Sequence, residues 1–290
     1  MRILVTGVNS PLGRSVSKYS KEAGHYIVGS VRSDKLGLDV VQLDDRIVIE
    51  LDDLEFCKRI PTDLDCIVHI AAAHSGAPHY LYQSNGLATY QLADFAARNG
   101  IKKFVHISSM SVYGAVKELI VGAQSTIRHS SPYGLSKWAG ECYLAAFASR
   151  IPSISIRSPA IIGCGASRNF LARLVHDMLV GRDEIVLENP AFLFNNAIHY
   201  NTFARFIVSL IEFNFKSHNY FPVASSMSVP LEMVVQHIAA RLAFKGSIVW
   251  RDGGQPPFSI NTEHAESFGF RPRALLDEID EWLNSESLTV

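Results

Sequence analysis

Short apolar runs alternate with amphipathic stretches through the first part of the chain. Ile3–Thr6, Tyr26–Val31 and Cys66–Ala71 are runs of this kind, and they are rich in β-branched residues. Such runs are typical of strands that are buried on both faces of a parallel sheet. After the turn at Gly7–Gly13 and as far as about Ala23, apolar residues instead recur at the spacing of one helix face. This alternation predicts βαβ units.

The same pattern continues as far as Gly165. It predicts further strands at Arg46–Leu51, Lys103–Ile107 and Ile154–Arg157, and helices at Leu81–Arg98 and from Pro132 onward. Strands that alternate with helices in this way indicate an α/β fold, a doubly wound parallel sheet.

Beyond Gly165 the alternation weakens. The elements predicted there are helices at Asn169–Val180, Asn201–Phe213, Leu231–Ala243 and Arg273–Asn284, and strands at Glu184–Leu187, Tyr220–Val223 and Ser247–Trp250. We expect Tyr220–Val223 to return to the main sheet and Arg251–Pro257 to form a loop. The predicted division is a sheet domain, residues 1–165 with a returning segment near 198–224, and a smaller C-terminal substrate lobe, residues 166–197 and 225–290. Ligands of parallel sheets bind at the carboxyl ends of the strands, so we expect the lobe over that edge.

Length and composition allow a large core and argue against two classes of partner. Of the 290 residues, 48% are hydrophobic, and 27 basic residues nearly balance 28 acidic ones, for a net charge of −1. This balance gives no reason to expect nucleic acid or a membrane surface as a partner, and no apolar run reaches the roughly 18 residues that span a bilayer. A strand at the very start (MRILVTG) leaves no room for a signal peptide. The cysteines, Cys57, Cys66, Cys142 and Cys164, form no C-x-x-C pair, so we expect reduced thiols in a cytoplasmic protein.

A glycine-rich turn directly follows the first strand. It runs from Gly7 to Gly13 (GVNSPLG) and opens the first helix. A helix N-terminus offers free N–H groups and a partial positive charge, which suit a pyrophosphate. Gly7 permits the tight turn, and Gly13 permits close packing of the helix on the strand. This position favours a dinucleotide-binding (Rossmann) domain over an ordinary connection between a strand and a helix.

The end of the second strand bears on which dinucleotide binds. NAD requires a carboxylate there for the ribose hydroxyls, whereas NADP requires a cation for the 2′-phosphate. Arg32 follows the strand, and the first acid is Asp34. A charge-assisted bond from Arg32 to the phosphate favours NADP. NAD is the alternative, with Arg32 then a solvated surface residue.

Tyr133 and Lys137 lie four residues apart in the stretch SSPYGLSKWAGE. Ser131 suits the N-cap of a helix and Pro132 its first position, so both side chains would lie on one face of the first turns. A free tyrosine has a pKa of about 10, and a neighbouring ammonium favours the phenolate and lowers that value. The pair is therefore a candidate acid/base device, although an exposed helix face gives the same pattern.

Taken in order, these residues resemble the extended short-chain dehydrogenase/reductase family, specifically its nucleotide-sugar epimerase/dehydratase/ketoreductase branch. The matching segments are Thr6–Gly13, Glu50-Leu51, His69–Ala73, Asn85, Ser108-Ser109 before Val112-Tyr113-Gly114, Tyr133–Lys137, Arg157–Gly165, Ile198–Tyr200 and Phe268–Pro272. They extend over nearly the whole chain, and their order and spacing are specific although no single one is decisive.

The resemblance implies a catalytic set. Tyr133 would be the general acid in reduction, or the base in oxidation, at a sugar hydroxyl or ketone, and Lys137 would bind the nicotinamide ribose and lower the tyrosine pKa. Ser109 would hold the reacting oxygen, with Ser111 as the alternative. Asn85 would support the cofactor or a relay water, unless it is a plain residue at a helix N-terminus. The implied cofactor contacts are Gly7, Ser10, Pro11, Leu12, Gly13, Arg32, Glu50, Leu51, Ala71, Ala72, Ala73, Lys137, Ser158 and Pro159.

The chain departs from the family pattern at several positions. Ser10 replaces the middle glycine of the G-x-x-G-x-x-G turn, and Ser158 replaces the proline after the buried arginine. The aspartate common after the second strand is missing. Asn201 and Thr202 stand where the family often has aspartates.

Three hypotheses about function remain open at this point. The resemblance favours a 4-ketoreductase or 4-epimerase that moves a hydride at a ring carbon, most often C4, of a nucleotide-sugar. Met110 and Ser111 stand where a dehydratase has an added acid, which argues against dehydration. The others are an NADPH-dependent reductase of a non-nucleotide ketone or aldehyde, and a non-catalytic NADP-binding regulator, a class that typically lacks the tyrosine–lysine pair.

Some weaker candidates concern the substrate. Arg168 and Asn169 could meet a diphosphate, and His74 and His199 could face the cleft. The spacing of His74 and His79 does not suit a metal site, so none is expected. The expected partner is a small molecule, and a homodimer is left open.

Overall fold

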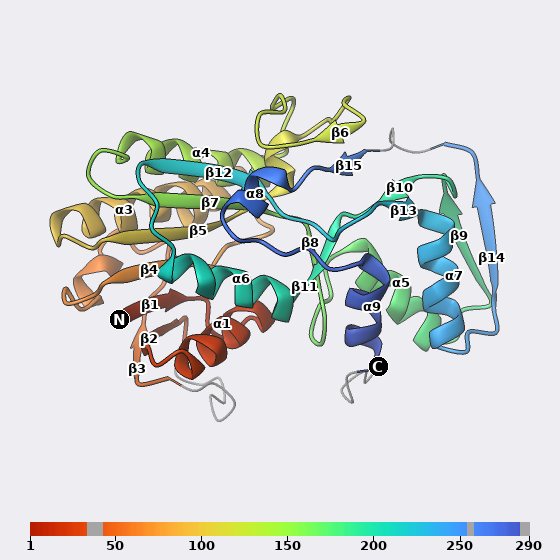
Figure 1. Ribbon diagram of the computed structural model, residues 1–290, viewed down its shortest axis with the longest axis horizontal. Helices are drawn as coiled ribbons and strands as arrows, with labels where there is room; N and C mark the ends of the chain where they lie inside the picture. Colours follow the sequence, from red (N-terminus) through yellow and green to blue (C-terminus); the bar gives the residue numbers. More distant parts are fainter. Residues whose placement is uncertain (34–42, 254–257, 285–290) are drawn as a thin grey trace.

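A parallel sheet of seven strands, in the order β12-β7-β5-β4-β1-β2-β3, forms the centre of the protein. The computed structural model describes residues 1–33, 43–253 and 258–284. All neighbouring strands of the sheet are parallel, as the sequence pattern predicts (Figure 1). The strands are β1 (Arg2–Thr6), β2 (Tyr26–Val31), β3 (Asp45–Val48), β4 (Cys66–His69), β5 (Lys103–Ser109), β7 (Ser153–Ser158) and β12 (His218–Pro222).

Alternate side chains of the strands supply two separate cores, one on each face of the sheet. Ile3 and Val5 of β1 pack in a cluster with residues of α1 (Pro11–Glu22) and α6 (Tyr200–Glu212). Leu4 points the other way, into a cluster with residues of α3 (Ala88–Arg98) and α4 (Pro132–Ala146). Helices therefore cover both faces (Figure 1), which confirms the doubly wound fold.

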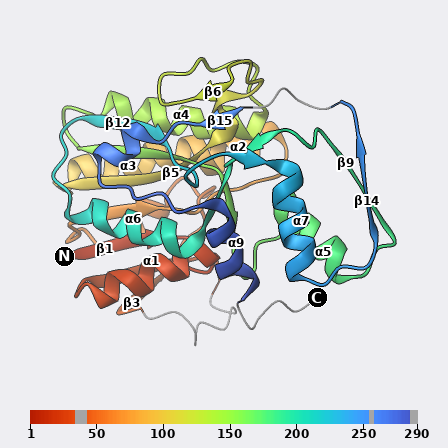
Figure 2. The same ribbon diagram turned by 45° about the vertical axis from the view of Figure 1, so that its right-hand side comes forward.

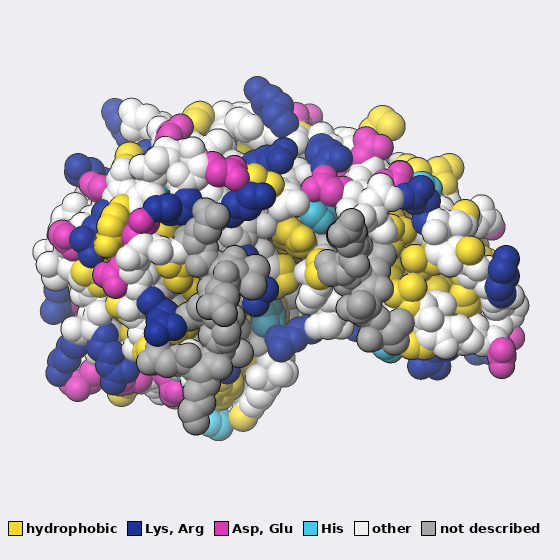
Figure 3. Space-filling model, turned by 90° about the horizontal axis from the view of Figure 1, so that it is seen from below, with side chains coloured by type: hydrophobic (Ala, Val, Ile, Leu, Met, Phe, Trp, Pro, Cys, Tyr) yellow, Lys and Arg dark blue, Asp and Glu magenta, His cyan; other side chains and the backbone are white. Residues whose placement is uncertain are grey.

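A further core lies beyond the carboxyl edge of the sheet. Apolar residues of α5 (Phe170–Leu179), α7 (Leu231–Arg241) and α9 (Leu275–Leu283) form it, with the parallel pair β9 (Glu184–Glu188) and β14 (Ser247–Arg251) at its side. Figure 2 shows these elements together at the right, and the face seen in Figure 3 is indented between this smaller body and the larger one that holds the sheet.

Short elements connect the two bodies. β8 (Ala160–Ile162) pairs with β11 (Ala197–His199) in parallel, β10 (Leu193–Phe194) pairs with β13 (Val229–Pro230), and β6 (Ile120–Val121) pairs with β15 (Ser259–Ile260). The remaining elements are α2 (Pro78–Leu81), the π-helix η2 (Tyr82–Leu87), the 3₁₀ helices η1 (Phe56–Arg59) and η3 (Met110–Tyr113), and α8 (Glu263–Ser267). Across the described ranges, no helix has the length and apolar character that a membrane crossing requires.

The structure confirms most predicted elements and corrects two. The predicted late strand at Tyr220–Val223 is β12, and it pairs with β7 of the main sheet as expected. The predicted helical stretch at Leu81–Arg98 is confirmed, and within it the π-helix η2 lies between α2 and α3. β3 ends at Val48, short of the predicted Leu51. In the predicted loop at 251–257, Arg251 belongs to β14 and residues 254–257 lie outside the described residues.

Candidate active site

A cavity of about 860 Å³ opens at the carboxyl ends of the central strands. Its wall takes Gly7 from the end of β1, Arg32 from β2, Ala71 from β4 and Ser109 from β5, and Arg168 comes from the loop after β8. The parallel strands end at one edge, so residues far apart in the sequence meet there.

The turn after β1 is shaped by contacts that only glycine allows. Gly7 has a φ of +75°, and a Cβ on it would lie 2.9 Å from the backbone of Ala71. A Cβ on Gly13 would lie 2.2 Å from the carbonyl oxygen of Gly7. Ser10, in place of the family's middle glycine, is the N-cap of α1: its hydroxyl accepts the N–H of Gly13 at 3.0 Å and donates to the Gly7 carbonyl at 2.8 Å. The turn is therefore compact and leaves the start of α1 facing the cavity.

Thr6 holds the neighbouring turn after β4 in place. Its hydroxyl oxygen accepts the N–H groups of Ile70 and Ala71, each at 3.1 Å. With both lone pairs used, its proton goes to Nδ1 of His69, 2.8 Å away. This fixes the small residues Ala71–Ala73 against the cavity.

Asn85 lies behind the wall of the cavity and is fully buried. Its amide accepts the N–H of Ala73 and donates to the carbonyl of the same residue, both at 2.8 Å, and it also donates to the Ser136 hydroxyl at 2.9 Å. Asn85 thus ties the turn after β4 to helix α4. A direct role toward the cofactor remains a prediction.

The start of α4 follows the local signals in the sequence. Ser131 is the N-cap, accepting the N–H of Gly134 at 3.1 Å, and Pro132 takes the first helical position. A Cβ on Gly134 would lie 2.1 Å from the carbonyl oxygen of Ser111. This close approach, possible only for glycine, brings Tyr133 next to the end of β5, where Ser109 lies.

Opposing influences act on the Tyr133 hydroxyl. Burial raises its pKa, whereas a hydrogen bond with Ser109 and the positive charge of Arg168 lower it less strongly. The expectation that this pKa lies below the ordinary value, through Lys137, is therefore wrong for the protein alone. Burial outweighs the nearby charge, and the cation that favours the phenolate is Arg168.

Lys137 lies deeper than the sequence suggests. It is 1% exposed, and its ammonium has no hydrogen-bond partner among the residues that the structure describes. Burial lowers its pKa to about 7, although the charge of Glu141 acts to raise it. A buried amine without a partner is costly, so this group is suited to a ligand that brings its own acceptor.

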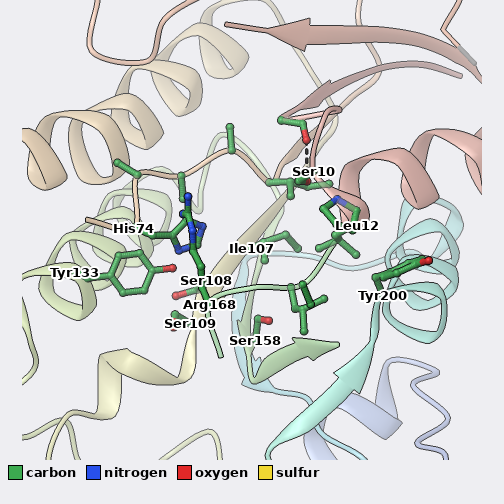
Figure 4. Close-up of a pocket in the computed structure, with 18 of the residues that line it drawn as sticks. Ser10, Leu12, His74, Ile107, Ser108, Ser109, Tyr133, Ser158, Arg168 and Tyr200 are labelled. Carbon is green, nitrogen blue, oxygen red and sulfur yellow. Dashed lines mark hydrogen bonds between the residues drawn. The ribbon is translucent and has the colours of Figure 1, made fainter. Parts of the chain in front are cut away.

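Two side chains from different loops, His74 and Arg168, lie beside the phenol of Tyr133 (Figure 4). The ring of His74 lies 5.3 Å from that of Tyr133 between centroids. Arg168 extends toward the same place, and its charge acts on both of them. Burial lowers the pKa of His74 to about 4, with the charges of Arg168 and Lys137 adding to this effect, so His74 is neutral at neutral pH.

The structure brings most of the predicted site residues to the cavity. Those that line it are Gly7, Ser10, Pro11, Leu12, Arg32, Leu51, Ala71, Ala72, Ala73, His74, Ser109, Tyr133, Ser158, Pro159, Arg168 and Asn169. Gly13, Glu50, Asn85, Lys137 and His199 are not part of the lining. His199 instead caps α6, where its Nδ1 accepts the N–H of Asn201 at 3.3 Å.

Other lining residues were missed by the sequence interpretation. They include Asn9, Ser30, Asp52, Tyr80, Ser84, Asn196 and Tyr200. Ser30 and Asp52 could have been found from their places near the ends of β2 and β3. Tyr200 and Asn196 come from the chain around β11, whose position beside β8 has no local signal in the sequence.

The lining fits a dinucleotide. A helix N-terminus and a tight glycine turn face one part of the cavity, Arg32 lies at the end of β2, and small residues follow β4. Outside this lining, the buried Lys137 amine is among the polar atoms without a partner in the described residues, and an acceptor from a bound ribose would satisfy it. In the described ranges, no group of three or more His, Cys, Asp and Glu side chains could hold a metal ion.

Comparison with known proteins agrees with this geometry. The model of the NAD dependent epimerase/dehydratase family matches residues 3–193. UDP-glucose 4-epimerase of Vibrio cholerae is 29% identical over 258 residues, which is 83% of this chain and 75% of the relative. GDP-mannose 3,5-epimerase 1 of Oryza sativa subsp. indica is 24% identical over 155 residues, 49% of this chain, and the match spans only 41% of that relative.

Solved structures share the fold along the whole chain. UDP-glucose 4-epimerase from Thermotoga maritima, solved with UDP-glucose, has a TM-score of 0.84 at 18% identity, covering 98% of this chain and 97% of its own. MoeE5, in complex with UDP-glucuronic acid and NAD, has a TM-score of 0.81 at 22% identity, and the match covers 98% of this chain and 96% of MoeE5. At these identities the likeness shows the fold alone.

Proposed function

This chain belongs to the NAD-dependent epimerase/dehydratase family, and from that premise we propose that it is a 4-epimerase of a nucleotide-sugar, with a UDP-sugar as the first candidate. The observation that carries the proposal is the position of Tyr133 on the cavity wall, hydrogen-bonded with Ser109. Ser109 ends β5, and the turns after the neighbouring strands β4 and β1 line the part of the cavity that fits a dinucleotide. The Vibrio cholerae relative, matched over three quarters of its length, is a UDP-glucose 4-epimerase.

Each group of the site has a distinct part in this proposal. A bound nicotinamide supplies the hydride chemistry. Tyr133 takes the proton of the sugar hydroxyl and returns it, and Ser109 holds the reacting oxygen by a hydrogen bond. Lys137 binds the ribose, which provides its buried amine with an acceptor. Tyr133 and Lys137, both present here, argue against a non-catalytic regulator.

One observation favours a second candidate, a 4-ketoreductase. Arg32 lines the cavity at the end of β2, where a cation suits the 2′-phosphate of NADP. Because NADPH is a released reductant, this would indicate net reduction rather than return of the hydride to the same sugar. Binding of NAD or NADP is part of the proposal, and Arg32 is the reason to prefer NADP.

The test is incubation with UDP-sugars and dinucleotide, and separately with a UDP-4-keto sugar and stoichiometric NADPH, which supplies the ketone that a ketoreductase would reduce. A 4-epimerase interconverts UDP-glucose and UDP-galactose, or a related pair, without net change in dinucleotide absorbance at 340 nm. A ketoreductase consumes one NADPH per 4-keto sugar reduced. Binding of dinucleotide without turnover of any nucleotide-sugar, but with reduction of simple ketones, would refute the nucleotide-sugar assignment. Absence of every reaction would support a regulator instead.

A further inference from the structure

Arg168 places a positive charge beside the proposed acid/base residue. Its side chain extends from the loop after β8 toward Tyr133 and His74 (Figure 4), and its charge acts on both groups. None of the ion pairs among the described residues includes Arg168. A guanidinium does not lose its proton near neutrality, so the charge there is permanent.

The backbone at Arg168 is held from the next residue onward. The Asn169 side chain caps α5 by accepting the N–H of Ala172 at 2.9 Å, and it donates to the carbonyl of Ile161 on β8 at 2.9 Å. Arg173 donates to the Arg168 carbonyl at 3.3 Å. The loop thus presents the arginine from a fixed base, as a specific binding residue requires.

In the part of the cavity wall that the structure describes, no acidic side chain lies at the end where Arg168 and Tyr133 are found. Among the described residues that line the cavity, Asp52 is the acidic one, and it follows β3 at the opposite edge of the sheet from the Tyr133 end. Arg32 is also at that far edge. The neutral His74 and the hydroxyl of Ser109 lie at the same end of the cavity as Arg168 (Figure 4). A ligand that fills this end of the cavity gains from an anionic group at Arg168.

We propose that Arg168 binds a carboxylate on the sugar, so that the substrate is a nucleotide-linked uronic acid. The inference rests on the proposed function, since it takes the sugar to lie against Tyr133. A planar guanidinium matches a carboxylate through two parallel N–H···O bonds. The same cation would also suit the diphosphate of the ligand, which was the expectation from the sequence.

The position beside the phenol favours the carboxylate. If Tyr133 exchanges a proton at C4, the carboxylate of a hexuronic acid is attached to the adjacent ring carbon, C5. The diphosphate is attached at C1, on the opposite side of the ring from C4. Arg168 extends toward Tyr133 (Figure 4), so the nearer of the two anions along the sugar is the carboxylate.

The experiment measures binding of UDP, UDP-glucose and UDP-glucuronate by calorimetry with dinucleotide present. Proteins are compared on a Tyr133→Phe background, which prevents conversion of the ligand. Arg168→Gln removes the charge from an exposed residue, and Arg150→Gln, an exposed arginine beyond α4 and outside the cavity, is the matched control. The melting temperature without ligand shows that each variant is folded.

A carboxylate site predicts a selective loss. Arg168→Gln should weaken the binding of UDP-glucuronate about tenfold or more, while the affinities for UDP-glucose and UDP change less than about threefold. Arg150→Gln should change none of these affinities. An equal loss for all three ligands would place the guanidinium on the diphosphate and overturn the inference but not the function. Unchanged affinities would also overturn it. If UDP and both UDP-sugars fail to bind, the proposed function fails with it.

Discussion

Tyr133 is the residue on which the proposed chemistry depends. Burial raises the pKa of its hydroxyl, and Ser109 and Arg168 favour the phenolate less strongly. Tyr133→Phe should lower kcat about 100- to 10,000-fold, the usual contribution of a general acid or base, with dinucleotide affinity nearly unchanged. Steady-state kinetics and dinucleotide titration would check this. Tyr143→Phe is the control, because that hydroxyl is on the same helix but bonds to Tyr82 outside the cavity. Full activity of Tyr133→Phe would contradict the role.

Lys137 makes stability depend on pH in a direction that can be worked out. Its pKa is about 7 in the folded protein and 10.5 in the unfolded chain. Between these values the unfolded state binds more protons, so stability should rise with pH from 7 to 10.5, and the full cost of burial remains below 7. Lys137→Met should therefore raise the free energy of unfolding at pH 7 by roughly 4 kcal/mol.

Urea denaturation of the unliganded protein at pH 7 and pH 10 would measure the Lys137 effect. The gain in unfolding free energy of Lys137→Met over wild type should be smaller at pH 10 than at pH 7. Lys18→Met, at an exposed residue of α1, should change the unfolding free energy at neither pH. A variant that is less stable than wild type at pH 7 would mean that the amine is satisfied inside the folded protein.

Arg32 tests the choice of cofactor at the end of β2. Arg32→Asp should shift the ratio of NADP to NAD affinity toward NAD by about tenfold or more, because a carboxylate repels the 2′-phosphate and binds the ribose hydroxyls. Fluorescence titration with both dinucleotides would measure the ratio, with Arg150→Asp as the control. An unchanged ratio would show that Arg32 does not contact the phosphate.

Residue identity and local spacing predicted some of this site and could not predict the rest. Ser131 and Pro132 gave the start of α4 correctly, because caps are local signals. The burial of Lys137 could not be read from its spacing, since a face shared with Tyr133 does not show how deep that face lies. The approach of Arg168 to Tyr133 depends on how β8 leaves the sheet, and no local pattern encodes that.

At the scale of elements, α9 supplies carboxylates that the family pattern has on α6. Asn201 and Thr202 replace the usual aspartates, and Glu278 of α9 accepts the His199 N–H at 2.9 Å and the Thr202 hydroxyl at 3.1 Å. Glu281 accepts from the Asn201 amide at 3.0 Å. Carboxyl groups of α9 thus hydrogen-bond to the first turn of α6, where the family pattern has aspartates within α6 itself.

Glu278 provides a test of this joint. Burial raises its pKa to about 7, although hydrogen bonds from Thr202 and His199 oppose the shift. Between 4.5 and 7 the folded state binds more protons, so stability should fall as pH rises through that range. Glu278→Gln should therefore unfold at a higher temperature than wild type at pH 8, and this advantage should vanish near pH 4.5.

Glu278→Ala is the contrasting variant. It leaves the buried N–H of His199 without an acceptor, which should cost about 1–3 kcal/mol at either pH. Calorimetric melting of both variants at pH 5 and pH 8 would separate charge from hydrogen bonding. Glu278→Gln melting below wild type at pH 8 would show that the carboxylate is favourable where it lies.

Prediction of whole elements succeeded where periodicity was strong and failed where packing decided. The parallel strands and most helices follow their apolar patterns. The π-helical form of Tyr82–Leu87 was not predicted. Gly86 there lies against α4, where a Cβ would be 3.1 Å from that of Ala139. That constraint comes from a helix distant in sequence.

At the scale of the whole molecule, the chain does not separate into consecutive units. β12 and α6 follow much of the smaller body in sequence but complete the sheet and one of its cores. A fragment of residues 1–165 should therefore fail to fold, since the face covered by Phe203, Phe206 and Ile207 would be exposed. Circular dichroism and NMR of the fragment would check this, and a cooperative melt with dispersed amide signals would contradict it.

The paired strands β8 and β11 lie where the two bodies meet, and Ile161 and Asn196 from this region also line the cavity. Because the strands are bonded to each other, the smaller body cannot tilt relative to the sheet without bending both of them together. We therefore expect this two-stranded pair to act as a stiff hinge, so that any bending of it would change the width of the cleft. A ligand in the cleft would restrict this bending, so tighter binding of the sugar and a more rigid hinge would go together.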